Sequence, residues 1–353
     1  MTDRMLFDNK ERVETRPSNG NENSFDYFNN SGRKDIIPVR EVMDNWFRIY
    51  PDSEKEEMKK RVKADFGPAF YELGMYCYFK NMSYDIFIHP TVPNSSKRPD
   101  FLAVKNAHHF YVEIKEMRML SDAERLKERR LNTLTDSINL VDSTYFMLCI
   151  ESIKFKSGKQ PSGKKIIKHF DDLIKAYAPD VYREMLEKDG FRFMPELDYS
   201  DNDVFIKVKL IPKALHLRGK RGRAIASYGA YTKLGGDEEM IKSAIQTKAT
   251  RYGELDKPFL ICLNYPSNLL HKEDIDIALY GNDGIFGTEN NPRNTRVSAV
   301  LITTFTVSGL LNTNLYYHEN PFAKNKIDFL PFTDLIKGLD LTDRYVQEFG
   351  SEL

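Results

Sequence analysis

Two carboxylates and a lysine lie close together between residues 99 and 115. Asp100 follows a proline, and Glu113 and Lys115 are separated by one residue in the run FYVEIK. This run has the composition of a strand, whose side chains alternate between two faces, so Glu113 and Lys115 project from the same face. If residues 99–104 form the preceding strand of a hairpin that turns across 105–108, Asp100 approaches Glu113. The sequence therefore predicts two carboxylates and an ammonium group at one end of a hairpin.

This combination of groups suits metal-assisted hydrolysis of a phosphodiester. Carboxylates brought close together repel each other, and a bound Mg²⁺, which Mn²⁺ can replace, compensates the repulsion. We expect Asp100 and Glu113 to hold the metal. A neighbouring lysine can orient or deprotonate the attacking water and stabilise charge on the phosphate, which is the role expected of Lys115. The alternative is an ordinary hairpin whose exposed face carries an ion pair.

The order of the predicted elements gives the fold class. A buried helix over 68–81 precedes strands at 84–90, 99–104 and 109–117, and a helix over 237–253 precedes a strand at 257–266. Strands and helices alternate without a regular βαβ rhythm, which favours an α/β fold with a mixed central sheet flanked by helices. Residues 116–235 form a large α+β insertion in the domain 68–353. Residues 1–35 are polar and are expected to be a flexible tail, followed by N-terminal helices over 36–67.

These residues resemble the PD-(D/E)XK nuclease superfamily. Pro99-Asp100 matches the PD motif, and Glu113-Ile114-Lys115 matches the (D/E)XK motif. The resemblance covers about residues 68–115 and 237–264 and does not cover the insertion. It implies a restriction-endonuclease-like core and a Mg²⁺-dependent nuclease. By analogy with the family, DNA is the expected substrate, and restriction or defence against foreign DNA is the expected role.

The family often adds an acidic residue from the first core helix, and Glu72 is the candidate here. Large apolar residues, Met75, Tyr76 and Phe79, follow it at i+3, i+4 and i+7, so they share its face of the helix. A carboxylate on such a face is unfavourable unless it is paired or holds a metal. We expect Glu72 to be a further metal ligand, and a paired carboxylate without a metal is the alternative.

Lys248 stands where a core residue is expected. Ile241, Ile245, Lys248 and Tyr252 fall at i, i+4, i+7 and i+11 and form one stripe. Some exonuclease-like members carry a Gln-x-x-x-Tyr motif on the corresponding helix, which Lys248-x-x-x-Tyr252 matches with lysine in place of glutamine. We expect Lys248 to be catalytic, through contact with a metal-bound water or the scissile phosphate. The alternative is that Lys248 extends past the stripe to solvent.

The composition limits the classes of binding site and the cellular location that the chain can have. The 353 residues carry 52 Lys and Arg and 52 Asp and Glu, so the chain has no overall cationic coat. Three widely spaced cysteines form no CxxC pair, which argues against a cysteine zinc site or a disulfide framework. No apolar run approaches the ~20 residues of a membrane span, and no signal peptide is evident. We expect a soluble cytoplasmic protein.

A basic loop is the candidate nucleic-acid contact. Residues 219–223 read GKRGR, and Lys220, Arg221 and Arg223 are expected to contact the phosphate backbone from a flexible loop. The alternative is a solvated loop. Two other functions stay open: a non-catalytic module that binds nucleic acid or protein on the same fold, and a nuclease subunit that requires a partner or activator. A homo-oligomer is also compatible with the sequence.

Overall fold

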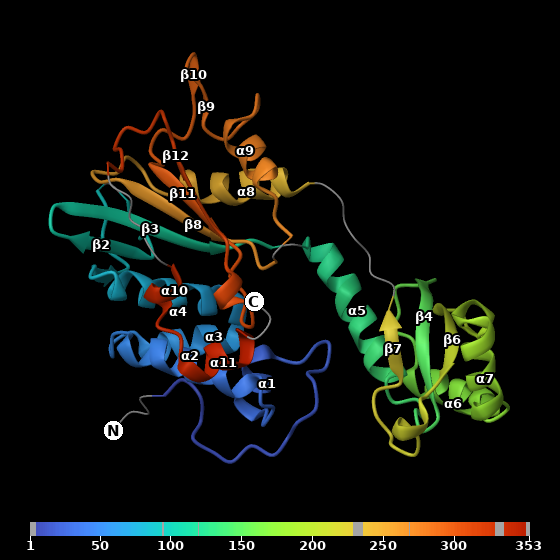
Figure 1. Ribbon diagram of the computed structural model, residues 1–353. Coiled ribbons are helices and arrows are strands. Elements are labelled where there is room, and N and C mark those ends of the chain that lie inside the picture. The colour runs from blue at the N-terminus through green and yellow to red at the C-terminus, as the bar shows by residue number, and fades with distance from the viewer. Residues whose placement is uncertain are drawn as a thin grey trace. The chain divides into compact units, whose positions relative to one another are not determined.

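The computed structural model describes residues 5–93, 95–118, 120–228, 236–267, 269–328 and 335–350 (Figure 1). The chain divides into two compact units. The core unit comprises Met1–Pro17, Asn23–Met119 and Gly235–Leu353, and the inserted unit comprises Ser18–Glu22 and Leu120–Leu234. Most of the inserted unit falls within the segment 116–235 that was expected as an insertion.

A six-stranded mixed sheet forms the centre of the core unit, as the sequence predicted. Its strand order is β1-β2-β3-β8-β11-β12. The strands are β1 (Asp85–Ile88), β2 (Phe101–Lys105), β3 (His108–Glu116), β8 (Phe259–Asn264), β11 (Ala299–Thr303) and β12 (Leu315–Glu319). The pairs β1–β2, β2–β3 and β11–β12 are antiparallel, whereas β3–β8 and β8–β11 are parallel.

Each face of this sheet is covered by helices (Figure 1). On β3, Val112 and Ile114 belong to the apolar core on one face, and Tyr111 belongs to the core on the other. The first face packs against α2 (Ile36–Ile49) and α4 (Phe66–Asn81), and the second against α8 (Asp237–Ala249) and α9 (Lys272–Tyr280). Every residue of α4 from Ala69 to Phe79 is buried, as expected of a helix that is apolar all round.

The N-terminal segment differs from the flexible tail that was expected over residues 1–35. Leu6 and Phe7 are buried, and their backbone N–H groups donate to Asp44 at 2.8 and 3.2 Å. Phe25 and Phe28 on α1 (Ser24–Asn30) are also buried. A few apolar side chains, widely spaced among polar ones, are enough to anchor this segment because α2 supplies both an apolar surface and a hydrogen-bond acceptor.

Shorter elements complete the core unit. They are α3 (Lys55–Ala64), β9 (Gly287–Thr288), β10 (Asn291–Pro292), a 3₁₀ turn (Leu310–Asn312), α10 (Leu335–Leu339) and α11 (Asp343–Phe349). The helix α3 packs against α4, and the Trp46 indole on α2 donates to the carbonyl of Leu339 at 2.6 Å. These contacts fix the helices on the α4 face of the sheet.

The inserted unit is an α+β structure with its own apolar core. Its sheet has the order β5-β6-β4-β7. The strands are β4 (Phe146–Phe155), β5 (Glu196–Ser200), β6 (Val204–Pro212) and β7 (Ile225–Tyr228). The helices are α5 (Asp122–Ile138), α6 (Gly163–Ile174) and α7 (Pro179–Asp189), with 3₁₀ turns at Phe191–Phe193 and Leu215–Leu217. Within the described parts of both units, no helix is long and apolar enough to span a membrane.

Candidate active site

The β2–β3 hairpin aligns the two predicted carboxylates. The strands β2 and β3 are joined across Asn106, whose φ of 54° lies in the left-handed region that tight hairpin turns require. Phe101 pairs with Val112, so Asp100 occupies the next register position, opposite Glu113. The backbone N–H of Ile114 donates to Asp100 Oδ2 at 2.6 Å. This bond fixes Asp100 beside Glu113.

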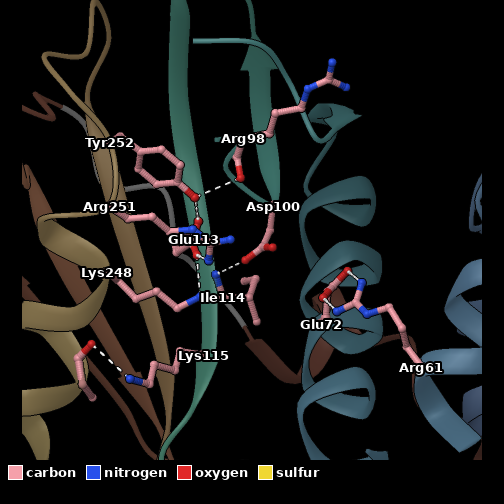
Figure 2. A network of polar contacts seen from close by, with 11 residues as sticks. Arg61, Glu72, Arg98, Asp100, Glu113, Ile114, Lys115, Lys248, Arg251 and Tyr252 are labelled. Carbon is pink, nitrogen blue, oxygen red and sulfur yellow. Dashed lines mark hydrogen bonds and ion pairs between the residues drawn. The ribbon is translucent and has the colours of Figure 1, made fainter. Parts of the chain in front are cut away.

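Glu113 is fully buried and is surrounded by polar side chains from the end of α8 (Figure 2). Its Oε1 pairs with the Lys248 ammonium and with Arg251 Nη1, the latter at 3.0 Å. Its Oε2 accepts from the Tyr252 hydroxyl. Lys248 is thus turned toward Glu113 rather than to solvent, and only 14% of its side chain is exposed.

Tyr252 connects the two halves of the motif. Its hydroxyl lies 2.9 Å from the carbonyl oxygen of Arg98, two residues before Asp100, and also contacts Glu113 (Figure 2). The hydroxyl has one proton to donate, so these two acceptors share it. Burial, followed by the charge of Glu113, raises the pKa of Tyr252, which keeps the phenol protonated.

Repulsion and burial act on both carboxylates. Burial, and then the charge of Glu72, raises the pKa of Asp100. Burial, and then the charge of Asp100, raises the pKa of Glu113. Each acid therefore titrates above its usual range, first because burial disfavours the charged form and then because a neighbouring acid disfavours a second negative charge. A cation placed between Asp100 and Glu113 would relieve this repulsion.

Lys115 points along the α8 face of the sheet, and its Nζ lies 3.5 Å from the carbonyl oxygen of Ala244 (Figure 2). Burial lowers the pKa of Lys115, and the nearby positive charges of Lys248 and Arg118 lower it further. A lysine with a lowered pKa has a larger fraction of free amine near neutral pH. Lys115 is accordingly suited to exchange a proton with a water or a phosphate oxygen.

Glu72 is held by an ion pair on the α4 face. Arg61 on α3 contacts both of its carboxylate oxygens, and Nη1 lies 2.8 Å from Oε1 (Figure 2). The Tyr50 hydroxyl lies 3.4 Å from the same Oε1. Glu72 remains close enough to Asp100 to raise its pKa. The structure thus places Glu72 in the paired state that was weighed as the alternative to a metal ligand.

The donor set that remains suits Mg²⁺. Among the described residues, no group of three or more His, Cys, Asp and Glu side chains is arranged to hold a metal. Mg²⁺, however, often uses only one or two carboxylates and keeps several waters. Asp100 and Glu113 supply two carboxylates, and within the described part of the chain Oδ1 of Asp100 accepts no hydrogen bond. Asp100 therefore offers an open oxygen to a metal, whereas both oxygens of Glu113 are held by Lys248, Arg251 and Tyr252, so a metal at Glu113 would replace one of these contacts.

The basic loop of the inserted unit is more tightly held than the flexible loop that was expected. Arg221 donates to the carbonyl of Leu140 at 2.9 Å, and Arg223 donates to the carbonyl of Ser18. Both arginines therefore stabilise the fold of the inserted unit. The side chain of Lys220 is exposed and makes no ion pair within the described residues, so it is the member of this group most available to a phosphate.

Two basic residues of the site were not identified from the sequence. Arg61 lies on another helix, eleven residues before Glu72, and no sequence period links the two. Arg251 lies two residues beyond the last residue of α8 and is not one of the stripe positions that singled out Lys248. The spacing of three residues between Lys248 and Arg251, which places both on the same side of a helix, was the sequence feature that could have identified Arg251.

Comparisons with known protein families, with curated proteins and with solved structures found no match for this chain. The site described above is therefore interpreted from its own geometry and charge. The arrangement of Asp100, Glu113 and Lys115 on one hairpin is the feature from which a function can be argued.

Proposed function

We propose that this chain is a Mg²⁺-dependent nuclease that hydrolyses phosphodiester bonds, with DNA as its expected substrate. The observation that carries the proposal is the register of the β2–β3 hairpin, which sets Asp100 opposite Glu113 and leaves Lys115 two residues further along the same strand. A mixed sheet with α4 on one face and α8 on the other supports the same proposal.

Asp100 and Glu113 are assigned to metal binding, and Lys115 is assigned to proton transfer. Mg²⁺ held by Asp100 and Glu113 would supply a Lewis acid that polarises a phosphate oxygen and acidifies a bound water. Lys115, with its lowered pKa, takes a proton from the attacking water at Nζ. In its protonated form the same ammonium stabilises negative charge on the phosphate.

The end of α8 positions Glu113 and the substrate. The Tyr252 hydroxyl holds one carboxylate oxygen of Glu113, and Lys248 and Arg251 lie at the other. Arg251 is 41% exposed, so its guanidinium is accessible to a phosphate while it remains within reach of Glu113. We assign Lys248 and Arg251 to the binding of the phosphate, because both are cations beside the proposed reacting group.

A polyanionic substrate agrees with the distribution of charge. Although the whole chain has no net charge, the inserted unit contains 22 Lys and Arg against 17 Asp and Glu. Its positive excess favours contact with a phosphate backbone, which gives affinity independent of base sequence. DNA, and a role in defence against foreign DNA, are proposed from the resemblance to the nuclease superfamily.

The substrate class is tested with the full chain. Plasmid, linear duplex and single-stranded DNA, and RNA, are incubated with the protein in Mg²⁺, Mn²⁺ or EDTA. The proposal expects cleavage of at least one of these nucleic acids with either metal and none in EDTA. Cleavage that is unchanged in EDTA would contradict the assigned chemistry.

A second candidate function is a binding module that needs no metal. It is favoured by one observation: Lys248 and Arg251 already neutralise Glu113, and Arg61 neutralises Glu72. Such a module would bind nucleic acid in EDTA, and binding would survive Asp100→Ala. A fluorescence-anisotropy titration of labelled DNA with this variant in EDTA, together with the cleavage assay, separates the two functions.

A further inference from the structure

The inserted unit contains a pocket that the proposed chemistry does not use. The pocket has a volume of about 370 Å³ and is lined only by residues of the inserted unit. Its polar and aromatic lining comes from the segments around β4 and α6, namely Asp142, Tyr145, Phe146, Asp171 and Tyr177. Small-molecule sites have volumes of about 300–1,000 Å³, so the pocket is large enough for a small organic ligand.

The walls of the pocket are largely apolar and aromatic. Phe146, Ile174 and Pro179 supply apolar surface, and Tyr145 and Tyr177 add two phenol rings. The N–H of Tyr177 donates to the carbonyl of Ile174 at 3.1 Å, which fixes Tyr177 directly after α6. Apolar side chains accommodate the alkyl stem of a ligand, and the face of an aromatic ring attracts a cation.

Two carboxylates, Asp142 and Asp171, are joined by a hydrogen bond that leaves each with an open oxygen. Asp171 Oδ1 accepts from the backbone N–H of Asp142 at 2.7 Å. Asp142 Oδ1 in turn accepts from the backbone N–H of Thr144 at 2.9 Å and from the Thr144 hydroxyl. Within the described parts of the chain, Oδ2 of neither acid accepts a hydrogen bond or joins an ion pair. These two oxygens are the acceptors that the pocket can offer to a ligand.

The position of Asp171 is unfavourable without a cation. Asp171 stands in the last turn of α6, where the backbone carbonyl groups carry partial negative charge and an acidic side chain is disfavoured. The neighbouring Asp172 is compensated by Lys168 at 2.6 Å and by Lys175 at 3.0 Å. Among the residues that the structure describes, Asp171 has no such partner. A cationic ligand would supply one.

The cations near the pocket are already engaged. Lys175 lines the pocket, but its ammonium is held in the ion pair described above. Hydrogen bonds from Thr144 lower the pKa of Asp142, and the charges of Arg221 and Lys213 lower it further. Neither of these two cations lines the pocket, and each donates to a backbone carbonyl at 2.9 Å. The lining therefore favours a positively charged ligand.

We infer that the pocket binds a small organic cation, an alkylguanidinium or alkylammonium group, whose head contacts Asp171 and Asp142 and whose stem packs against Phe146. A free amine such as agmatine carries this chemistry, and so does an arginine side chain of a peptide. The inference does not depend on the proposed nuclease, because no residue of the pocket belongs to the β2–β3 hairpin or to α8.

Calorimetric titration of the full chain in EDTA tests the inference without nucleic acid. The probes are butylguanidinium and its neutral isostere butylurea. The wild type should bind butylguanidinium about tenfold or more tightly than butylurea, since a hydrogen bond to a charged group is the stronger one. Asp171→Asn keeps an acceptor for the Asp142 N–H. It should weaken butylguanidinium by about tenfold or more and leave butylurea unchanged.

Asp189→Asn is the matched control. Asp189 is the last residue of α7, is exposed, does not line the pocket and makes no ion pair within the described residues. Its substitution should leave the affinity for both probes unchanged. Titration with agmatine and with a short peptide that contains one arginine then identifies the source of the cation, because the preferred source binds more tightly.

Four results would overturn the inference. They are no binding of butylguanidinium by the wild type at millimolar concentration, equal affinity for butylguanidinium and butylurea, an unchanged affinity for butylguanidinium in Asp171→Asn, and tighter binding of butylphosphate than of butylguanidinium. Thermal unfolding checks that the variants are folded. If Asp171→Asn does not fold, the comparison of the charged and neutral probes on the wild type still decides the matter.

Discussion

Asp100 lies opposite Glu113 in the β2–β3 hairpin, one position beyond the last paired residues, Phe101 and Val112. The relationship is fixed by main-chain register and by the hydrogen bond from the Ile114 N–H to Asp100. A shift of one residue in the hairpin would send Glu113 to the other face of the sheet. The two-residue turn at Asn106 and the division of the β3 side chains between the apolar cores on the two faces of the sheet both oppose such a shift.

Tyr252→Phe is expected to lower both stability and activity. The substitution removes the hydroxyl that serves Glu113 and the carbonyl of Arg98 and leaves a buried carboxylate oxygen without this donor. The expected loss of unfolding free energy is about 1–3 kcal/mol. Urea unfolding measures this loss, and cleavage kinetics measure the accompanying fall in kcat.

Tyr280→Phe is the matched control for Tyr252→Phe. The Tyr280 hydroxyl donates to the carbonyl of Glu319 at 2.8 Å at a partly exposed position outside the proposed site. Its removal should cost about 1 kcal/mol or less and leave cleavage unchanged. Equal effects of the two substitutions on activity would contradict the positioning role assigned to Tyr252.

The pH dependence of cleavage should report Lys115. Because burial and neighbouring cations lower the pKa of Lys115 below its ordinary value of 10.5, its free amine forms at a lower pH than that of an exposed lysine. Activity should therefore rise with pH and level off below pH 10.5. Lys115→Arg keeps the charge, cannot lose the proton, and should abolish this rise with a loss of about 10²-fold or more in rate.

A Lys115→Arg variant with the same pH profile as the wild type would show that another group accounts for the rise. The profile is measured as kcat/KM on one DNA substrate. The ionic strength is held constant, so that the salt-dependent part of DNA binding is the same at every pH.

Glu116 should make the fold less stable as pH rises. Burial raises the pKa of Glu116 from its ordinary value of 4.5 to about 7, with Asp65 adding to the effect. The folded state thus binds a proton more tightly than the unfolded state, and stability is lost as pH rises through the window between 4.5 and about 7. Relative to Glu116→Gln, the wild type should lose roughly 2–3 kcal/mol between pH 5 and pH 8.

Urea unfolding of the wild type and Glu116→Gln at the two pH values tests this. Asn264 Nδ2 lies 3.4 Å from Glu116 Oε1, so the amide variant retains an acceptor for this contact. A free-energy difference between the two proteins that does not change with pH would contradict the raised pKa of Glu116.

Lys220 is the residue of the basic loop to test for contact with nucleic acid. Arg221 and Arg223 bond to backbone carbonyls, so replacing either one would disturb the inserted unit. Lys220→Gln should weaken DNA binding and reduce the slope of log K against log salt by roughly 0.7–0.9. Lys34→Gln removes the same charge at an exposed position of the core unit and should change neither quantity. An unchanged slope in Lys220→Gln would contradict the phosphate contact.

The parts of the site that depend on short-range patterns were predictable from the sequence. Alternation along β3 placed Glu113 and Lys115 on one face, and the polar break at 105–108 indicated the hairpin that aligns Asp100. The mixed central sheet followed from the order of helices and strands. The apolar stripe of α8 singled out Lys248 and predicted that it contacts a metal-bound water or the phosphate, whereas the structure shows it paired with Glu113.

The parts that depend on packing between distant helices were not predictable. Arg61 reaches Glu72 because α3 packs on α4, and neither helical period nor composition encodes that contact. The N-terminal segment was expected to be flexible because polar residues dominate it, yet Leu6 and Phe7 dock against α2. The strength of such docking depends on the partner surface, which a single segment does not reveal.

The most direct test of the account is cleavage of DNA by the purified full chain in Mg²⁺, beside Asp100→Asn and Lys115→Ala, with Mg²⁺ replaced by EDTA as the control. The account predicts that the wild type cuts only with metal, that both variants are inactive, and that both keep the thermal unfolding profile of a folded protein. Cutting of equal rate by the wild type and both folded variants would contradict the assignment of the active site to the β2–β3 hairpin.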